Sequence, residues 1–198
     1  MDYNGISMFG ALTPVGSTNI SFKADYSRIG KFYQKQQKHI NIEHRANIKY
    51  TFECINTHER FELLSAFSRA YGSHDKFLMR SYKTDFILKE PAVTDDTSIT
   101  VEFSKEYYQF QFHAFLIYIE GHSKIYKVIG VGENDPTKTV LYLDSGLSNN
   151  IEACKTIEIC YLGRWDSDAL SFDHDDILYS TTAIGFQEVS QAEFEISV

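Results

Sequence analysis

Residues 56–81, NTHERFELLSAFSRAYGSHDKFLMRS, carry the clearest helix signal of the chain. Asn56 is a favourable N-cap residue, and Glu59 follows three positions later, as in a capping box. Arg69 suits the last turn of a helix, and Gly72 supplies a left-handed residue to end it. Apolar residues between these ends recur at steps of three or four, which predicts one buried helix face: Phe61, Leu64, Phe67 and Tyr71.

A single helix in an otherwise strand-like chain predicts a helix that covers the open side of a sheet or sandwich. Aromatic residues, which favour strands, make up 15% of the sequence. The length of 198 residues fits one domain with an insert, or two small domains. We therefore predict a mainly β fold, a β-sandwich with one α-helix at about 57–71 packed on it, plus a small inserted β-barrel-like module.

Short strands separated by turns follow the helix. Five of them, with turns at 120–123 and 132–136, predict a small barrel or compact sandwich over residues 91–162: 99–103, 110–119, 124–131, 139–143 and 156–162. The last strands are expected to pair back with the N-terminal sheet, which includes 19–24: 169–172, 177–181, 184–189 and 194–198. The predicted domains are thus 1–90 plus 163–198, with 91–162 as the insert.

Residues 40–54 alternate strictly between apolar or semi-apolar and polar side chains, which indicates a strand with one buried face. Fifteen residues of strand would span about 50 Å, far more than an average strand. Either a turn interrupts the run near 45–47, or the strand projects from its domain and pairs with a neighbouring subunit.

Residues 1–16 are interpreted as an extended arm. The basic stretch 27–38 reads as a solvated loop or as a segment that orders against a partner.

Charge and cysteine content limit the functional classes. A net charge of −8 argues against a surface that neutralises nucleic-acid phosphates. It is compatible with a channel wall along which DNA passes without binding. The cysteines Cys54, Cys154 and Cys160 form no CxxC pair, so reduced, buried thiols are expected. Neither a secretory signal nor a membrane-spanning apolar run is visible, so we expect a soluble protein made in a cytoplasm.

No motif declares a chemical activity. An acidic stretch with one histidine could hold a metal, but it lacks the calcium-loop spacing, so solvated turns are favoured: Asp166, Asp168, Asp173, His174, Asp175 and Asp176. Gly130 and Gly132 stand in GVGEND, which reads as a hairpin rather than a phosphate loop. The histidines are scattered, with no zinc-hydrolase pattern. We therefore predict no catalytic residue, no cofactor and no metal.

From the helix onward, the order of several pieces resembles the distal tail or baseplate proteins of long-tailed bacteriophages. These pieces are ELLSAFSRAYG, KFLMRS with Asp85 after it, ITVEF, IYKVIGV, VLYLDSGL, YLGRWDSDALSF and AIGFQEV. The piece FLMRSYKTD departs from the aromatic- and proline-bearing form typical of that position.

The resemblance implies a virion structural protein of the tail tip with no enzymatic activity. Such proteins form a homo-oligomeric, hexameric ring that joins the tail tube to the baseplate hub and fibres, with the tape measure protein as a further partner. It also implies that the protein does not bind nucleic acid sequence-specifically and does not span a membrane. On this interpretation residues 40–54 and the N-terminal arm cross subunit boundaries. The alternative is a monomeric β-rich glycan-binding or hydrolytic domain, with Trp165 and Tyr161 as surface aromatics beside Asp166 and Asp168.

Overall fold

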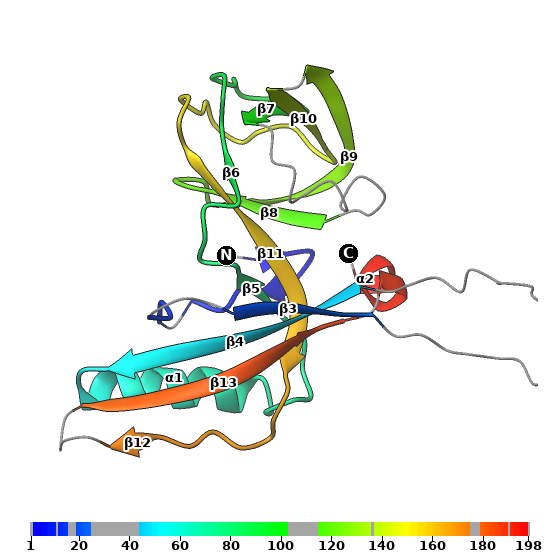
Figure 1. Ribbon diagram of the computed structural model, residues 1–198. Coiled ribbons are helices and arrows are strands. Elements are labelled where there is room, and N and C mark those ends of the chain that lie inside the picture. The colour runs from blue at the N-terminus through cyan, green and yellow to red at the C-terminus, as the bar shows by residue number, and fades with distance from the viewer. Residues whose placement is uncertain are drawn as a thin grey trace, which may run out of the picture. The chain divides into compact units, whose positions relative to one another are not determined.

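The computed structural model describes residues 2–10, 12–15, 19–24, 44–102, 115–135, 137–174, 179–189 and 191–197 (Figure 1). Its strands pair in antiparallel ladders, and the described residues contain two helices, so the predicted mainly β class with a helix on a sheet is confirmed. The chain divides into two compact units. The first contains residues 1–10 and 76–162, and the second contains 11–75 and 163–198.

Helix α1 (Thr57–Arg69) of the second unit begins where the sequence predicts. The side chain of Asn56 accepts a 2.9 Å hydrogen bond from the Glu59 N–H. The Glu59 carboxylate in turn accepts a 2.7 Å bond from the N–H of Ile55, one residue before the cap. Two of the backbone donors around the start of the helix are thereby paired.

The end of α1 is a Schellman turn with an unusual residue in it. The Gly72 N–H bonds the carbonyl of Phe67, and the Tyr71 N–H bonds that of Ser68. Gly72 is left-handed as predicted, with φ +63°, but Tyr71 before it also has a positive φ, 46°. Glycine is the usual residue at the position Tyr71 occupies, because a β-carbon is strained there.

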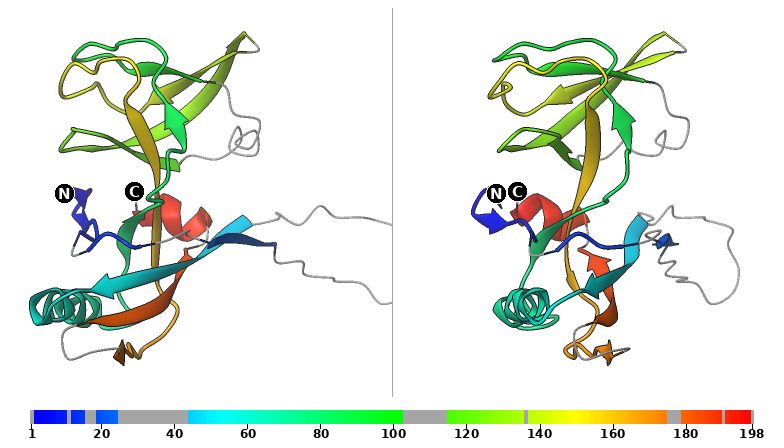
Figure 2. Two further views of the ribbon diagram at one scale, coloured as in Figure 1. Left: turned by 60° about the vertical axis from the view of Figure 1, so that its left-hand side comes forward. Right: turned by 90° about the vertical axis from the view of Figure 1, so that its left-hand side faces the viewer.

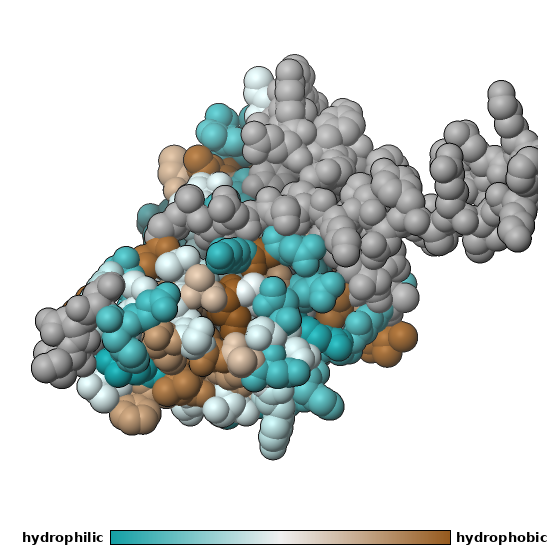
Figure 3. All heavy atoms as spheres, turned by 60° about the horizontal axis from the view of Figure 1, so that its bottom comes forward, coloured by the Kyte–Doolittle hydropathy of each residue, from teal (hydrophilic) through white to brown (hydrophobic). Residues whose placement is uncertain are grey.

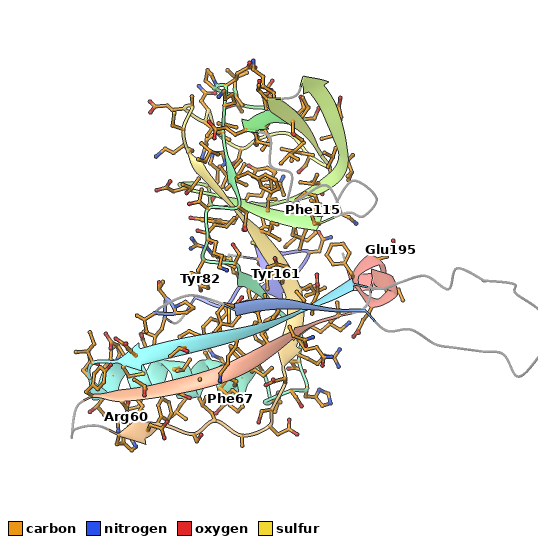
Figure 4. The ribbon with its side chains drawn as sticks, viewed as in Figure 1. Arg60, Phe67, Tyr82, Phe115, Tyr161 and Glu195 are labelled. Atoms are coloured by element: carbon orange, nitrogen blue, oxygen red, sulfur yellow. The ribbon has the colours of Figure 1, made fainter. Side chains whose placement is uncertain are left out.

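The buried face of α1 differs from the predicted one. Leu63 and Phe67 are the buried residues of the helix, whereas Phe61 is 65% and Tyr71 74% exposed. Steps of three or four starting from Phe61 describe the outward side of the helix, while the i, i+4 pair of Leu63 and Phe67 faces the sheet. Phe67, labelled in Figure 4, stacks on Trp165 with ring centroids 6.2 Å apart.

The sheet of the second unit is built from two long strands with shorter ones beside them. β4 (His44–Cys54) pairs with β3 (Asn19–Ala24) on one side and with β13 (Ser180–Glu188) on the other. β13 also pairs with β12 (Asp173–His174) and with the last three residues of β11 (Thr156–Trp165). The predicted return to the N-terminal sheet is therefore correct for 177–181 and 184–189, most of whose described residues form the single strand β13 where the sequence predicted two.

β4 confirms the predicted alternation, whereas pairing with a neighbouring subunit stays a prediction. From Ala46 to Cys54 its even-numbered side chains are at most 1% exposed. The strand runs without a turn through 45–47, so the interrupted alternative is wrong. β3 pairs with residues 44–49 and β13 with residues 47–54, and the Thr51 carbonyl accepts from Val15, so most of the backbone of β4 is paired within its own chain. Residues 40–43 and 27–38 lie outside the described residues.

The first unit is a small barrel. Successive antiparallel pairs join β11 to β8 (Phe115–Ile119), β8 to β9 (Ile125–Asp135), β9 to β10 (Lys138–Leu143), and β10 to β7 (Ser98–Glu102). β6 (Phe86–Ile87) pairs with β11, and a bridge from Leu88 to Val101 connects this segment to β7. The ladder thus returns to β11, as a barrel requires.

This unit is larger than the predicted insert. It takes in residues 76–90, because β5 (Phe77–Arg80) and β6 pair with β11. It also takes in the N-terminal residues, which form a two-stranded ladder of β1 (Asp2–Tyr3) and β2 (Ile6–Ser7). The Tyr3 hydroxyl donates a 2.6 Å hydrogen bond to Asp144. The described part of the predicted arm therefore folds onto its own chain, and Figure 2 shows the same strands from two further sides.

Two C-terminal predictions are wrong. Residues 194–197 belong to helix α2 (Gln191–Ser197) and not to a strand, and the buried Phe194 together with an ion pair from Arg164 to Glu193 holds this helix. Residues 169–172 form no strand, because a Ser167 side-chain turn binds the Ala169 N–H at 3.1 Å.

Candidate assembly surfaces and polar clusters

The outward face of α1 is the first candidate surface. A hollow of about 280 Å³ lies over it, lined by His58, Phe61, Glu62, Ser65 and Arg69. These residues recur at helical steps, so they form one stripe along the helix. Brown and teal side chains are mixed on the described surface turned forward in Figure 3, so the exposed apolar residues are set among polar ones.

The ends of this stripe carry opposite charges. His58 lies 3.4 Å from the Glu62 carboxylate, one turn along the helix. Their side chains are 82% and 44% exposed, so this pair contributes little to folding stability. Arg69 turns its Nε toward the Ser65 carbonyl at 3.4 Å. Acidic and basic groups therefore flank the small Ser65 on either side.

The β3 edge is the second candidate surface. β3 stands at one end of the strand order, and β4 is its described neighbour. On the side of β13 away from β4 lie the end of β11 and β12, which has two residues, both exposed. An edge strand presents unpaired backbone donors and acceptors and accepts a further strand.

The acidic stretch does not come together as a metal site. Among the described residues, no group of three or more histidine, cysteine or acidic side chains is placed to hold a metal ion. Asp173 and His174 are exposed in β12, whereas Asp166 and Asp168 lie in the segment that follows β11. Asp175 and Asp176 are outside the described residues.

Asp168 holds the turn that ends α1. Its carboxylate accepts hydrogen bonds from the Ser73 N–H, at 3.0 Å, and from the Ser73 hydroxyl. These bonds lower the pKa of the Asp168 carboxyl. Asp166 has a different role, since its N–H bonds the Gly185 carbonyl at 3.0 Å and its carboxylate covers the space where a Gly185 side chain would stand.

The aromatic residues proposed to bind a glycan are buried. Trp165 is 1% and Tyr161, labelled in Figure 4, is 3% exposed. Trp165 packs between Phe67 and Phe186, each ring centroid 6.2 Å away. Neither ring offers a face to a sugar, so the surface expected for the alternative function is contradicted.

A second cluster, in the first unit, has no counterpart among the sequence predictions. Arg80 donates to the Glu158 carboxylate from Nε at 2.9 Å and also from Nη2. Its guanidinium lies over the ring of Tyr118, 4.2 Å from the centroid, and over that of Tyr82 at 5.1 Å. Burial opposes the charge on Arg80, but the hydrogen bond and the attraction to Glu158 outweigh it and raise the Arg80 pKa. Burial raises the Tyr82 pKa to about 12.

A third cluster joins His122, Tyr126 and Ser148. The Tyr126 hydroxyl lies 3.1 Å from His122 Nδ1 and 3.0 Å from the Ser148 hydroxyl, and it accepts the Ser148 N–H at 2.9 Å. His122 is 5% and Tyr126 0% exposed, and burial lowers the His122 pKa. Ser148 Oγ also lies 3.4 Å from His122 Nδ1, so the three side chains form one polar network that connects the Ser148 loop to β9.

The cysteines behave as predicted with one exception. All three are free thiols, and Cys54 and Cys160 are buried. Burial raises the pKa of both. Cys154 is exposed, contrary to prediction, because it lies in a turn with a positive φ of 67°.

Comparison of the chain with models of known protein families gives no match, and comparison with curated proteins gives none either. In the part of the chain that the structure describes, no helix has the length and apolar character to cross a membrane.

Proposed function

We propose that this protein is a structural component of a bacteriophage tail tip, where it forms a ring that joins the tail tube to the baseplate hub and fibres. The observation that supports this function best is the strand order of the second unit, which leaves β3 at the edge of the sheet among the described residues. Natural proteins cover or interrupt such edges, and pairing with a neighbouring subunit is one way to do so.

The two sides of the sheet in the second unit differ, which suits a ring. One side ends in the six residues of β3, whereas the other carries the two residues of β12 and the last residues of β11. A closed ring of six copies requires two different surfaces on each copy that meet head to tail. We assign the subunit contact to the β3 edge in place of residues 44–54, most of whose backbone pairs with β3 and β13.

The chemistry of the chain agrees with a role in assembly. A net charge of −8 suits a lumen through which DNA passes without binding. The polar clusters built around Asp168, Glu158 and Tyr126 are engaged in holding turns and loops. On this proposal the protein has no catalytic site and resides in the virion, after synthesis in the host cytoplasm, with tube, tape measure and hub proteins as its partners.

Mass measurement tests the ring. Size-exclusion chromatography with light scattering, alone and with the tail-tube protein, is expected to give a hexamer that appears as a ring in negative-stain images. A protein that stays monomeric at high concentration, with and without the tube protein, would refute the proposal.

Proline substitutions test the assigned edge. Neighbouring residues of a strand direct their N–H groups to opposite sides. Of Ser21→Pro and Phe22→Pro, one therefore removes an outward donor and the other a donor to β4. The outward substitution is expected to keep the thermal unfolding of the wild type and to lose the ring. If neither variant loses the ring while folded, the contact lies elsewhere.

A further inference from the structure

The side chains on the outward stripe of α1 are arranged so that the stripe is complementary to a second copy of itself. Ser65 points directly away from the mean direction of the buried Leu63 and Phe67, at about 100° of rotation per residue. Phe61 and Glu62 lie four and three positions before Ser65, and Arg69 lies four positions after it. A small residue thus stands at the centre of the face, with an aromatic ring and an acid on one side and a base on the other.

We propose that the α1 helices of two copies of this chain pack antiparallel across a two-fold axis at Ser65. In that arrangement the partner's Arg69 comes to the level of Phe61 and Glu62, since each lies about 4.5–6 Å along the helix from the centre. The guanidinium then meets a carboxylate and an aromatic face at once, and both are favourable partners for arginine. The two-fold axis makes the contact twice.

The size of the central residue permits the approach. Helices in contact lie about 8–10 Å apart, and small side chains at the crossing allow the shorter distances. The hollow over Ser65 is walled by the longer side chains of the stripe, His58, Phe61, Glu62 and Arg69. Phe61 is 65% exposed in the isolated chain, so the contact would bury an aromatic side chain that is now largely in water.

The charges favour a second copy over an unrelated helix. An acidic partner would meet Glu62 as well as Arg69, and a basic partner would meet Arg69 as well as Glu62. An antiparallel copy places each charge opposite its complement, and a parallel copy does not. This contact goes beyond the proposed ring, because it relates two copies by a two-fold axis and therefore pairs monomers or whole rings.

Charge reversal tests the pairing. Glu62→Arg and Arg69→Glu are each expected to halve the mass measured by sedimentation velocity, from dimer to monomer or from a double ring to a single ring. The variant that carries both changes restores the opposite charges across the axis and is expected to recover the wild-type mass. Glu152→Arg, on an exposed residue of the first unit, is the control and should leave the mass unchanged.

Each outcome decides the matter. Unchanged mass in both single variants, or failure of the double variant to recover it while all variants unfold at the wild-type temperature, overturns the antiparallel contact. A wild type that forms dimers but no ring supports this contact and refutes the proposed function. A ring whose mass neither substitution alters supports the proposed function and refutes the antiparallel contact.

Cross-linking gives a test that does not depend on charge. In a Cys154→Ser background, which removes the exposed native thiol, Ser65→Cys is expected to form a disulfide-linked dimer on mild oxidation, because the two thiols would face each other at the axis. Ser123→Cys, exposed in the first unit, is the matched control and should remain monomeric on denaturing gels. Equal cross-linking of the two variants would overturn the contact.

Discussion

The carboxylate of Asp85 accepts a 2.7 Å hydrogen bond from the backbone N–H of Ile159 in the middle of β11. The same side chain accepts a hydrogen bond from the hydroxyl of Ser81, which also bonds the backbone of Lys83. Asp85 is 7% exposed and Ser81 0%. One buried acid therefore joins the segment between β5 and β6 to the strand against which both pair.

Replacing Asp85 by alanine should destabilise the first unit by about 2–3 kcal/mol. The substitution leaves the Ile159 N–H and the Ser81 hydroxyl buried without this acceptor, and charged acceptors contribute more than neutral ones. Urea denaturation followed by far-ultraviolet circular dichroism measures the change. Asp75→Ala, at a largely exposed acid of the second unit, should stay within about 0.5 kcal/mol of the wild type.

Asp85 also shows what the sequence could and could not reveal. The resemblance included this aspartate after KFLMRS without giving it a role, because its backbone hydrogen-bond donor is 74 residues further along the chain. The same limit applies to Arg80 and Glu158, which are 78 residues apart. Local patterns did predict the α1 cap, β3 and the alternation of β4, because those depend on neighbouring residues.

The errors at α1 and α2 differ in kind. Phe194 is buried but lies in a helix instead of a strand, whereas Phe61 was predicted on the buried face of α1 and faces outward. Periodicity gives the spacing of a face but not which of two overlapping sets is covered, and that depends on the sheet. The exposed Phe61 therefore belongs to the outward stripe and not to the core.

Tyr71→Gly should stabilise the protein by about 1 kcal/mol. Tyr71 adopts a positive φ of 46° and is 74% exposed, so its side chain adds backbone strain and little burial. Glycine removes that strain while the Schellman hydrogen bonds remain. Tyr71→Ala is the matched control: it deletes the ring but keeps the β-carbon, so its denaturation midpoint should not rise. An equal gain in both variants would show that the ring and not the backbone is responsible.

Gly185→Ala should destabilise the second unit by about 1–3 kcal/mol, the usual range for overpacking. A β-carbon at Gly185 would stand 1.9 Å from a carboxylate oxygen of Asp166. Asp166→Ala in the same chain removes the obstructing group, so the double variant should recover most of the loss. A double-mutant cycle by thermal unfolding measures this coupling, and additive single effects would contradict the steric explanation.

His122 should make the stability of the first unit fall as the pH drops below 6.5. Burial lowers the folded-state pKa from the ordinary 6.5, so the unfolded chain binds the proton first and stability rises with pH between the two values. The stabilisation is fully present above pH 6.5 and is lost as the pH falls toward the folded pKa. His122 Nδ1 lies 3.1 Å from the Tyr126 hydroxyl. The free energy of unfolding of wild type and of His122→Asn should be measured from pH 8 to pH 5, and the difference between them should shrink toward acid pH. A difference that does not change with pH would show that the pKa of His122 is the same in the folded and unfolded chain.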